Sequence, residues 1–160
     1  MIQQGNVGSG VDLLQNSIAT LSAEGYELYA TELNGSLAQG LASMGRLDQA
    51  LPTIDTTIAQ LERHGELFMP ELQRIRGEIL EKAADERGAE EAFGRSIELA
   101  DRQSALSWRL RASTSFAQLH SRQGRREEAR AALSETYARF SEGFETADLK
   151  AAQRLLVALR

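Results

Sequence analysis

Hydrophobic residues recur at every third or fourth position along most of this 160-residue chain, with polar residues between them. This spacing places the hydrophobic side chains on one face of an α-helix, so the pattern predicts amphipathic helices. Runs rich in Val, Ile and Thr, which favour strands, are almost absent. We therefore predict an all-α chain with about eight helices, over residues 11–24, 26–44, 47–63, 67–84, 87–101, 104–122, 125–140 and 146–159.

Glycine residues separate most of these predicted helices. Glycine readily adopts the positive φ angle that commonly closes a helix, because it carries no Cβ atom. Connections this short force consecutive helices to pack as antiparallel hairpins. The glycines expected at the helix boundaries are Gly25, Gly45, Gly65, Gly88, Gly124 and Gly143.

One short pattern returns along the chain with a period of 39 to 40 residues. In each copy a small residue is followed four positions later by a large apolar residue. The pairs are Ala50 with Ile54, Ala89 with Phe93, and Ala129 with Leu133. One hairpin cannot bury its apolar face alone, so the repeated hairpins are expected to stack into a solenoid.

The chain opens with the glycine-rich stretch QQGNVGSGV, Gln3 to Val11, which is compatible with a phosphate-binding loop or with a turn between helices. A P-loop needs a Lys and a Ser or Thr after its glycines and a strand before them, whereas Val11 and Asp12 follow here. Gly10 lies 40 residues before Ala50, which favours the turn of a repeat. We therefore predict the remnant of a truncated repeat over residues 1–10, helical repeats with a period of 39–40 residues over 11–145 and a C-terminal capping helix over 146–160.

Composition and charge narrow the classes of function. With 42% hydrophobic and 26% charged residues, the chain has the composition of an ordinary globular protein and not of a disordered one. The absence of cysteine excludes disulfides and fits a cytoplasmic location, and no apolar run approaches the roughly 20 residues that span a bilayer. The formal net charge of −5 disfavours a general nucleic-acid binder.

The sequence offers few residues for catalysis. His64 and His120 are the two histidines, and neither stands in a metal-binding or catalytic motif, so a structural role is favoured for both. The acidic stretch from Asp85 to Glu91 lacks the alternating oxygen ligands of a calcium loop, and a solvated helix start accounts for it better. We predict no catalytic residue, no cofactor, no metal and no enzymatic activity.

Large aromatic or thioether side chains occupy one repeat position. Trp108 stands 39 residues after Met69, which has Phe68 beside it, and Tyr29 stands 40 residues before Met69. Packing in the core or between repeats is the favoured interpretation of this series. A patch that faces a partner is the alternative.

The repeat residues resemble tetratricopeptide repeats (TPRs). The segments Gly45–Ile58 and Gly124–Tyr137 each begin with Gly-Arg and continue with the small-x₃-large-x₂-small pattern of the second TPR helix. The period is longer than the usual 34 residues. The resemblance implies a right-handed superhelix of antiparallel helix hairpins, whose first helices line a concave face.

A narrower resemblance covers nearly the whole chain. The segments Glu62–Leu80, Ser104–Leu133 and Tyr137–Leu156 are similar to the C-terminal repeat region of large bacterial signalling proteins, and FSEGFETADL is the most distinctive string. In those proteins a class III adenylate/guanylate cyclase domain, or a winged-helix or LuxR-type DNA-binding domain, is fused to a predicted NTPase. The resemblance implies a non-catalytic protein–protein interaction scaffold within a larger signalling or transcription-regulatory protein.

The expected partner is a protein or peptide, or upstream domains of the same polypeptide, bound on the concave face. Aligning the repeats on their small residues places nine polar side chains there, and their mixed charge does not match a Lys/Asn clamp for a terminal carboxylate. The nine are Glu32, Gln39, Arg74, Glu78, Glu81, Arg111, Thr114, Gln118 and Ser121. Ordinary solvated polar positions are the alternative interpretation.

Other functions stay open at the level of sequence. A nucleic-acid-contacting repeat would rest on arginine pairs such as Arg109 and Arg111, and a ligand-binding sensor that regulates an upstream cyclase or ATPase is the remaining alternative. Leu14 and Ile18 lie on the apolar face of the predicted first helix. We expect this end to leave apolar surface uncovered and to support a weak homodimer.

Overall fold

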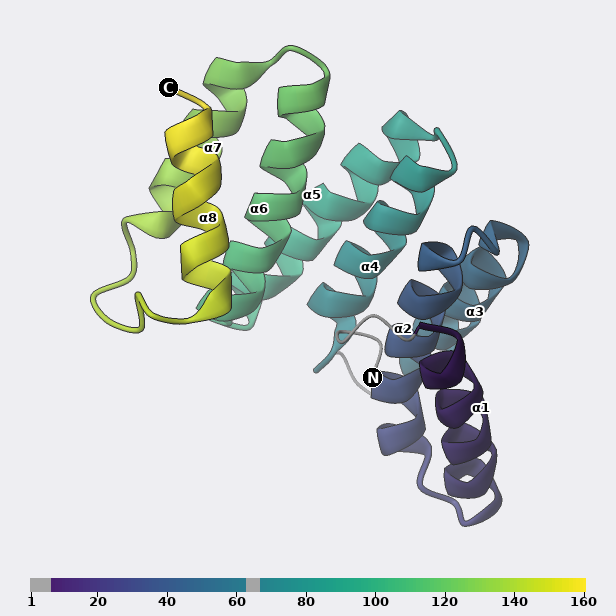
Figure 1. The fold of residues 1–160 in the computed structure, drawn as a ribbon. Helices are drawn as coiled ribbons and strands as arrows, with labels where there is room; N and C mark the ends of the chain where they lie inside the picture. Colours follow the sequence, from purple (N-terminus) through teal and green to yellow (C-terminus); the bar gives the residue numbers. More distant parts are fainter. Residues whose placement is uncertain (1–6, 63–66) are drawn as a thin grey trace.

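The described residues of the chain, 7–62 and 67–160, form eight α-helices in the computed structural model. Figure 1 shows them as a row of antiparallel hairpins that runs from α1 at one end to α8 at the other. The helices are α1 (Val7–Ala23), α2 (Glu27–Ser43), α3 (Leu47–Leu61), α4 (Met69–Lys82), α5 (Glu86–Arg102), α6 (Leu106–Arg122), α7 (Arg126–Tyr137) and α8 (Ala147–Ala158). The predicted all-α arrangement of about eight helices is confirmed for the described residues.

Alternate helices form the two sides of the solenoid. Helices α2, α4, α6 and α8 contact one another in sequence, in addition to contacting their hairpin partners. This arrangement makes α2–α3, α4–α5 and α6–α7 three successive repeats. The first helices of these repeats form one continuous face, which we call the concave face by analogy with TPR solenoids.

The small-and-large pairs identified in the sequence form the core of the hairpins. Ala50, Ala89 and Ala129 are fully buried, and so are the large residues that follow them four positions later. In the middle repeat, a Cβ atom added at Gly77 would lie 2.5 Å from Phe93 Cε1. Gly77 therefore lets α4 approach α5 closely enough to cover the Phe93 ring.

In each repeat, one further buried position carries a residue with a hydroxyl group. Thr57, Ser96 and Thr136 are at most 2% exposed. The Ser96 hydroxyl donates to the Pro70 carbonyl at 2.5 Å, and Thr136 pairs with the Ser113 hydroxyl at 3.1 Å. Because buried hydroxyls are costly without a partner, these two bonds help to fix how α5 sits on α4 and α7 on α6, whereas the Thr57 hydroxyl donates to the Thr53 carbonyl within α3.

Four of the predicted boundary glycines have the expected backbone. Gly25, Gly45, Gly124 and Gly143 have φ between 74° and 82°. Gly88, by contrast, lies inside α5, where its N–H donates to the Asp85 cap at 2.9 Å, so its prediction as a boundary is wrong. Two residues with side chains take the left-handed conformation instead, at the turns before and after α5: Ala84 with φ 60° and Ser104 with φ 53°.

The N-terminal helix begins earlier than the sequence predicted. Helix α1 starts at Val7 and not at residue 11, so Gly8 and Gly10 are helical and do not form a turn. Gly10 and Val11 are buried, and Val7 packs against the first core cluster. Burial of Val7 on that core accounts for the additional turn of helix.

Four sequence predictions fall wholly or partly on residues that are not described, among them the truncated repeat over 1–10, of which residues 1–6 are not described. Gly65 and His64 lie in the segment 63–66, and the side chain of Tyr29 is outside the described residues as well. Across residues 7–62 and 67–160, no helix combines the length and apolar character needed to cross a membrane.

Candidate binding face

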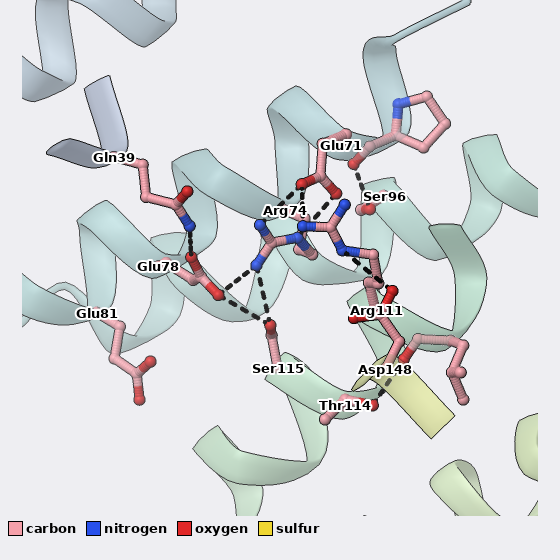
Figure 2. Close-up of polar contacts among 12 residues, drawn as sticks. Gln39, Glu71, Arg74, Glu78, Glu81, Ser96, Arg111, Thr114, Ser115 and Asp148 are labelled. Carbon is pink, nitrogen blue, oxygen red and sulfur yellow. Dashed lines mark hydrogen bonds and ion pairs between the residues drawn. The ribbon is translucent and has the colours of Figure 1, made fainter. Parts of the chain in front are cut away.

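A continuous chain of polar contacts crosses the concave face (Figure 2). From α2, the Gln39 amide donates to Glu78 Oε2 at 3.0 Å, and Glu78 on α4 pairs with Arg74. The Arg74 guanidinium also contacts Glu71, which in turn pairs with Arg111 on α6 at 2.8 Å. One network therefore joins the first helices of all three repeats.

Arg74 occupies the centre of this network. Its guanidinium donates to both Glu71 carboxylate oxygens at 2.9 Å and lies 3.4 Å from the Ser115 hydroxyl on α6. Although burial alone would lower the pKa of Arg74, the hydrogen bonds and negative charge of Glu71 and Glu78 outweigh burial and raise the pKa. Arg74 was predicted on the concave surface. Because the residue is only 4% exposed, it lies beneath that surface.

The network continues to the last helix. Arg111 Nε lies 3.9 Å from Asp148 Oδ2 on α8, and Ser115 donates to Glu78 at 3.1 Å. Three carboxylates, Glu71, Glu78 and Asp148, thus surround two guanidinium groups. The charges of the network nearly neutralise one another, with an excess of acid.

Two hollows flank the network on the same face. The first, which we call the central groove, has a volume of about 530 Å³ and is lined by polar residues of α2, α4 and α6, among them Gln39, Glu78, Glu81, Gln118 and Arg122. The second, which we call the aromatic cleft, has a volume of about 310 Å³. It is lined by Glu32, Gly35, Phe68, Leu72, Trp108 and Arg111, among others.

Aromatic side chains form one part of the aromatic cleft. The rings of Phe68 and Trp108 meet at a centroid distance of 6.1 Å, so Trp108 packs against the residue that precedes α4 of the neighbouring repeat. Trp108 is half-buried, whereas Met69 at the equivalent position is 3% exposed. The contact with Phe68 agrees with packing between repeats, and the partner-facing alternative stays a prediction for the exposed part of Trp108.

The nine polar residues predicted for this face differ in their positions. Seven of them take part in the network or line one of the two hollows: Glu32, Gln39, Arg74, Glu78, Glu81, Arg111 and Gln118. The Thr114 hydroxyl donates to the Leu110 carbonyl of its own helix at 2.7 Å, and Ser121 is half-buried outside both linings.

Sequence reasoning missed Glu71, the residue that links Arg74 to Arg111. Glu71 lies 39 residues after Glu32 and 40 residues before Arg111, so the period places all three at one repeat position. This signal was sufficient to identify Glu71. Asp148 and Gly35 also belong to the face, but Asp148 lies on the helix that follows the last full repeat.

His120 is packed between helices and is not part of the candidate binding face. It is 7% exposed, its ring lies 4.2 Å from the Phe116 ring, and its Nε2 atom is 3.2 Å from Glu90 Oε1. A hydrogen bond from Arg125 lowers the pKa of Glu90, burial opposes this effect, and His120 lowers that pKa further. These contacts join α6 to α5 and to the turn before α7, away from both hollows.

The fold has counterparts among solved structures. No protein-family model matches the chain, and no curated protein matches it. A structure from Podosopora anserina, described as a putative kinesin light chain with nearly identical TPR-like repeats, has a TM-score of 0.70 at 17% identity, covering 99% of this chain and 79% of that chain. A single-residue variant of that protein has a TM-score of 0.71 at the same identity and coverage. The chain therefore has a TPR-like repeat fold.

Proposed function

We propose that this TPR-like solenoid is a non-catalytic protein-interaction module whose concave face binds an extended peptide segment of a partner. The observation that carries the proposal is the position of both hollows on the first helices of the repeats. Solenoids generally present an extended concave surface of this kind to their partners. Most of the ionisable groups beside the hollows, among them Glu71, Glu78 and Arg111, are engaged in ion pairs and do not converge on an open space, which argues against catalysis.

The resemblance to repeat regions of bacterial signalling proteins supports a narrower proposal. In it, the chain belongs to a larger signalling or transcription-regulatory polypeptide, and the bound segment comes from a partner or from another domain of that polypeptide. Sequencing of the whole gene tests this proposal, since it predicts a cyclase, NTPase or DNA-binding domain in the same reading frame.

The arginine pairs offer little support for the nucleic-acid alternative. A phosphate-binding surface needs cations that are free to contact phosphates. Here the guanidinium groups that would form it are already engaged by acidic side chains: Arg76 by Asp55, Arg109 by Asp101 and Glu135, and Arg125 by Glu90 and Glu128.

Selection of peptides tests the proposed function directly. Random peptides displayed on phage would be selected against the whole chain, and the selected peptides would be measured by calorimetry. Gln118→Arg places a long cationic side chain at the central groove and is expected to weaken binding by roughly tenfold, which corresponds to about 1.4 kcal/mol.

The matched control is Gln15→Arg, which makes the same change at an exposed position of α1, outside the row of first helices. It is expected to leave affinity unchanged. Selected peptides that tolerate Gln118→Arg but lose affinity with Gln15→Arg would contradict the proposal.

A further inference from the structure

The aromatic cleft contains a carboxylate that lacks the partners of its counterpart in the next repeat. Glu32 and Glu71 occupy the same position of successive repeats. Glu71 is held between Arg74, three residues further along its own helix, and Arg111, the equivalent residue of the next repeat. The residue three positions after Glu32 is Gly35 and not an arginine, and the equivalent residue of the next repeat is Glu71, which is itself a carboxylate.

Glu32 is consequently exposed and has no hydrogen-bonding or ion-pair partner among the described residues. The absence of a side chain at Gly35 has a packing reason, because an added Cβ would lie 3.0 Å from Leu72 Cδ2. The close approach of α2 and α4 thus leaves no space on Gly35 for an arginine. Glu32 itself lines the aromatic cleft.

We propose that this cleft binds an arginine side chain of the partner's peptide segment, an inference that rests on the proposed function. The incoming guanidinium would pair with Glu32 as Arg74 and Arg111 pair with Glu71. The planar cation suits the neighbouring rings of Phe68 and Trp108, which line the cleft, since guanidinium groups stack on aromatic faces.

Charge complementarity favours this occupant over an acidic or a purely apolar side chain. The carboxylates of the network already outnumber its guanidinium groups, and Glu32 adds another negative charge at the cleft. Arg111, which also lines the cleft, is paired with Glu71 and lies near Asp148, so its charge is offset within the protein.

Trp108 is the single tryptophan of the chain, so its fluorescence reports on the aromatic side of this cleft. The probe is the pentapeptide acetyl-Gly-Ser-Arg-Ser-Gly-amide, compared with versions that carry norleucine, phenylalanine or glutamate in place of arginine. The arginine peptide is expected to shift the Trp108 emission with a dissociation constant in the millimolar range. The norleucine peptide, which keeps the aliphatic stem without the charge, should bind about fivefold more weakly.

Substitution of the carboxylate gives the second readout. Glu32→Gln should reduce the affinity of the arginine peptide about fivefold and leave that of the norleucine peptide unchanged. The matched control Glu127→Gln removes the same charge from an exposed position of α7 and should change neither affinity.

The outcomes separate this inference from the proposed function. Equal binding of the arginine and norleucine peptides, tighter binding of the phenylalanine or glutamate peptide, or no effect of Glu32→Gln would overturn the arginine proposal. In each of those cases, phage-selected peptides that still require the concave face would leave the proposed function standing. If the selected peptides do not use the concave face either, both proposals fail.

Discussion

The middle repeat, α4–α5, differs from the repeats on either side in how the same positions are filled. The two flanking repeats pair an alanine of the first helix with a moderately large residue of the second, Ala38 with Ile54 and Ala117 with Leu133, each pair within one core cluster. The middle repeat pairs Gly77 with Phe93. The side chain of Phe93 is larger than that of Ile54 or Leu133, and its partner Gly77 is smaller than alanine. The combined volume of the two side chains therefore stays similar in all three repeats.

The same comparison holds for charge on the concave face. The position that carries Gly35 in the first repeat and Thr114 in the third carries Arg74 in the middle repeat. There the arginine joins neighbouring helices through ion pairs, whereas Gly35 is packed against Leu72 and leaves Glu32, beside it in the aromatic cleft, without such a partner among the described residues. The same repeat architecture thus gives a junction closed by the ion pairs of Arg74 and a junction where the Glu32 carboxylate is unpaired within the described part of the chain.

Removal of the arginine from the closed junction should have the largest effect. Arg74→Met leaves the carboxylates of Glu71 and Glu78 without their buried counter-charge, and we expect a loss of about 3 kcal/mol in the free energy of unfolding. Urea denaturation measures this loss. The control Arg87→Met breaks an exposed ion pair with Glu91 and should cost less than about 1 kcal/mol. Equal losses in the two variants would show that the network does not hold the repeats together.

The exchange of volume in the middle repeat can be tested by a double-mutant cycle. Gly77→Ala drives a methyl group into the Phe93 ring and should destabilise the protein by about 2 kcal/mol. Phe93→Leu in the same chain restores the pairing of the flanking repeats and should recover at least about 1 kcal/mol of that loss.

Gly94→Ala is the matched control for Gly77→Ala, since a Cβ at Gly94 meets no atom within 4 Å. It should stabilise the helix by about 0.5 kcal/mol through reduced backbone entropy of the unfolded chain. Simple additivity of Gly77→Ala and Phe93→Leu would contradict the account of matched volumes.

The turns around α5 distinguish the middle repeat once more. Ala84 and Ser104 have positive φ angles, whereas the residues with positive φ in the other described connections are glycines: Gly25, Gly45, Gly124 and Gly143. Ala84→Gly and Ser104→Gly should each raise stability by about 0.5–1 kcal/mol, because a Cβ atom is unfavourable in this conformation. Gly45→Ala should lower stability by about 1 kcal/mol. A fall in melting temperature for both glycine variants would contradict the assigned backbone.

The smallest effect is expected at the N-terminal helix. Leu13 is 54% exposed, and Leu14 and Ile18 are only partly buried on the first core cluster. We predict weak self-association through this helix, detected by sedimentation equilibrium at tens of micromolar. Leu13→Glu should abolish it without changing the melting temperature, whereas Val157→Glu, at an exposed position of α8, should leave it intact. A strictly monomeric wild-type chain would rule out this prediction.

The sequence allowed the helices to be predicted closely, because periodic burial and chain turns leave local signals. It failed at Gly88, since a glycine in the first turn of one helix looks like a glycine that ends the helix before it. It also placed Arg74 on the surface. Whether such a residue points outward or between helices depends on the side chains around it, here Glu71 and Ser115, and that arrangement is fixed only by tertiary packing.

Mapping of a bound peptide by NMR tests most directly whether the concave face is the binding surface. Amide chemical shifts of the whole ¹⁵N-labelled chain would be followed as a phage-selected peptide is added. We expect the largest changes on α2, α4 and α6, together with the indole N–H of Trp108. Largest changes on α3, α5 and α7, with Trp108 unmoved, would contradict this expectation.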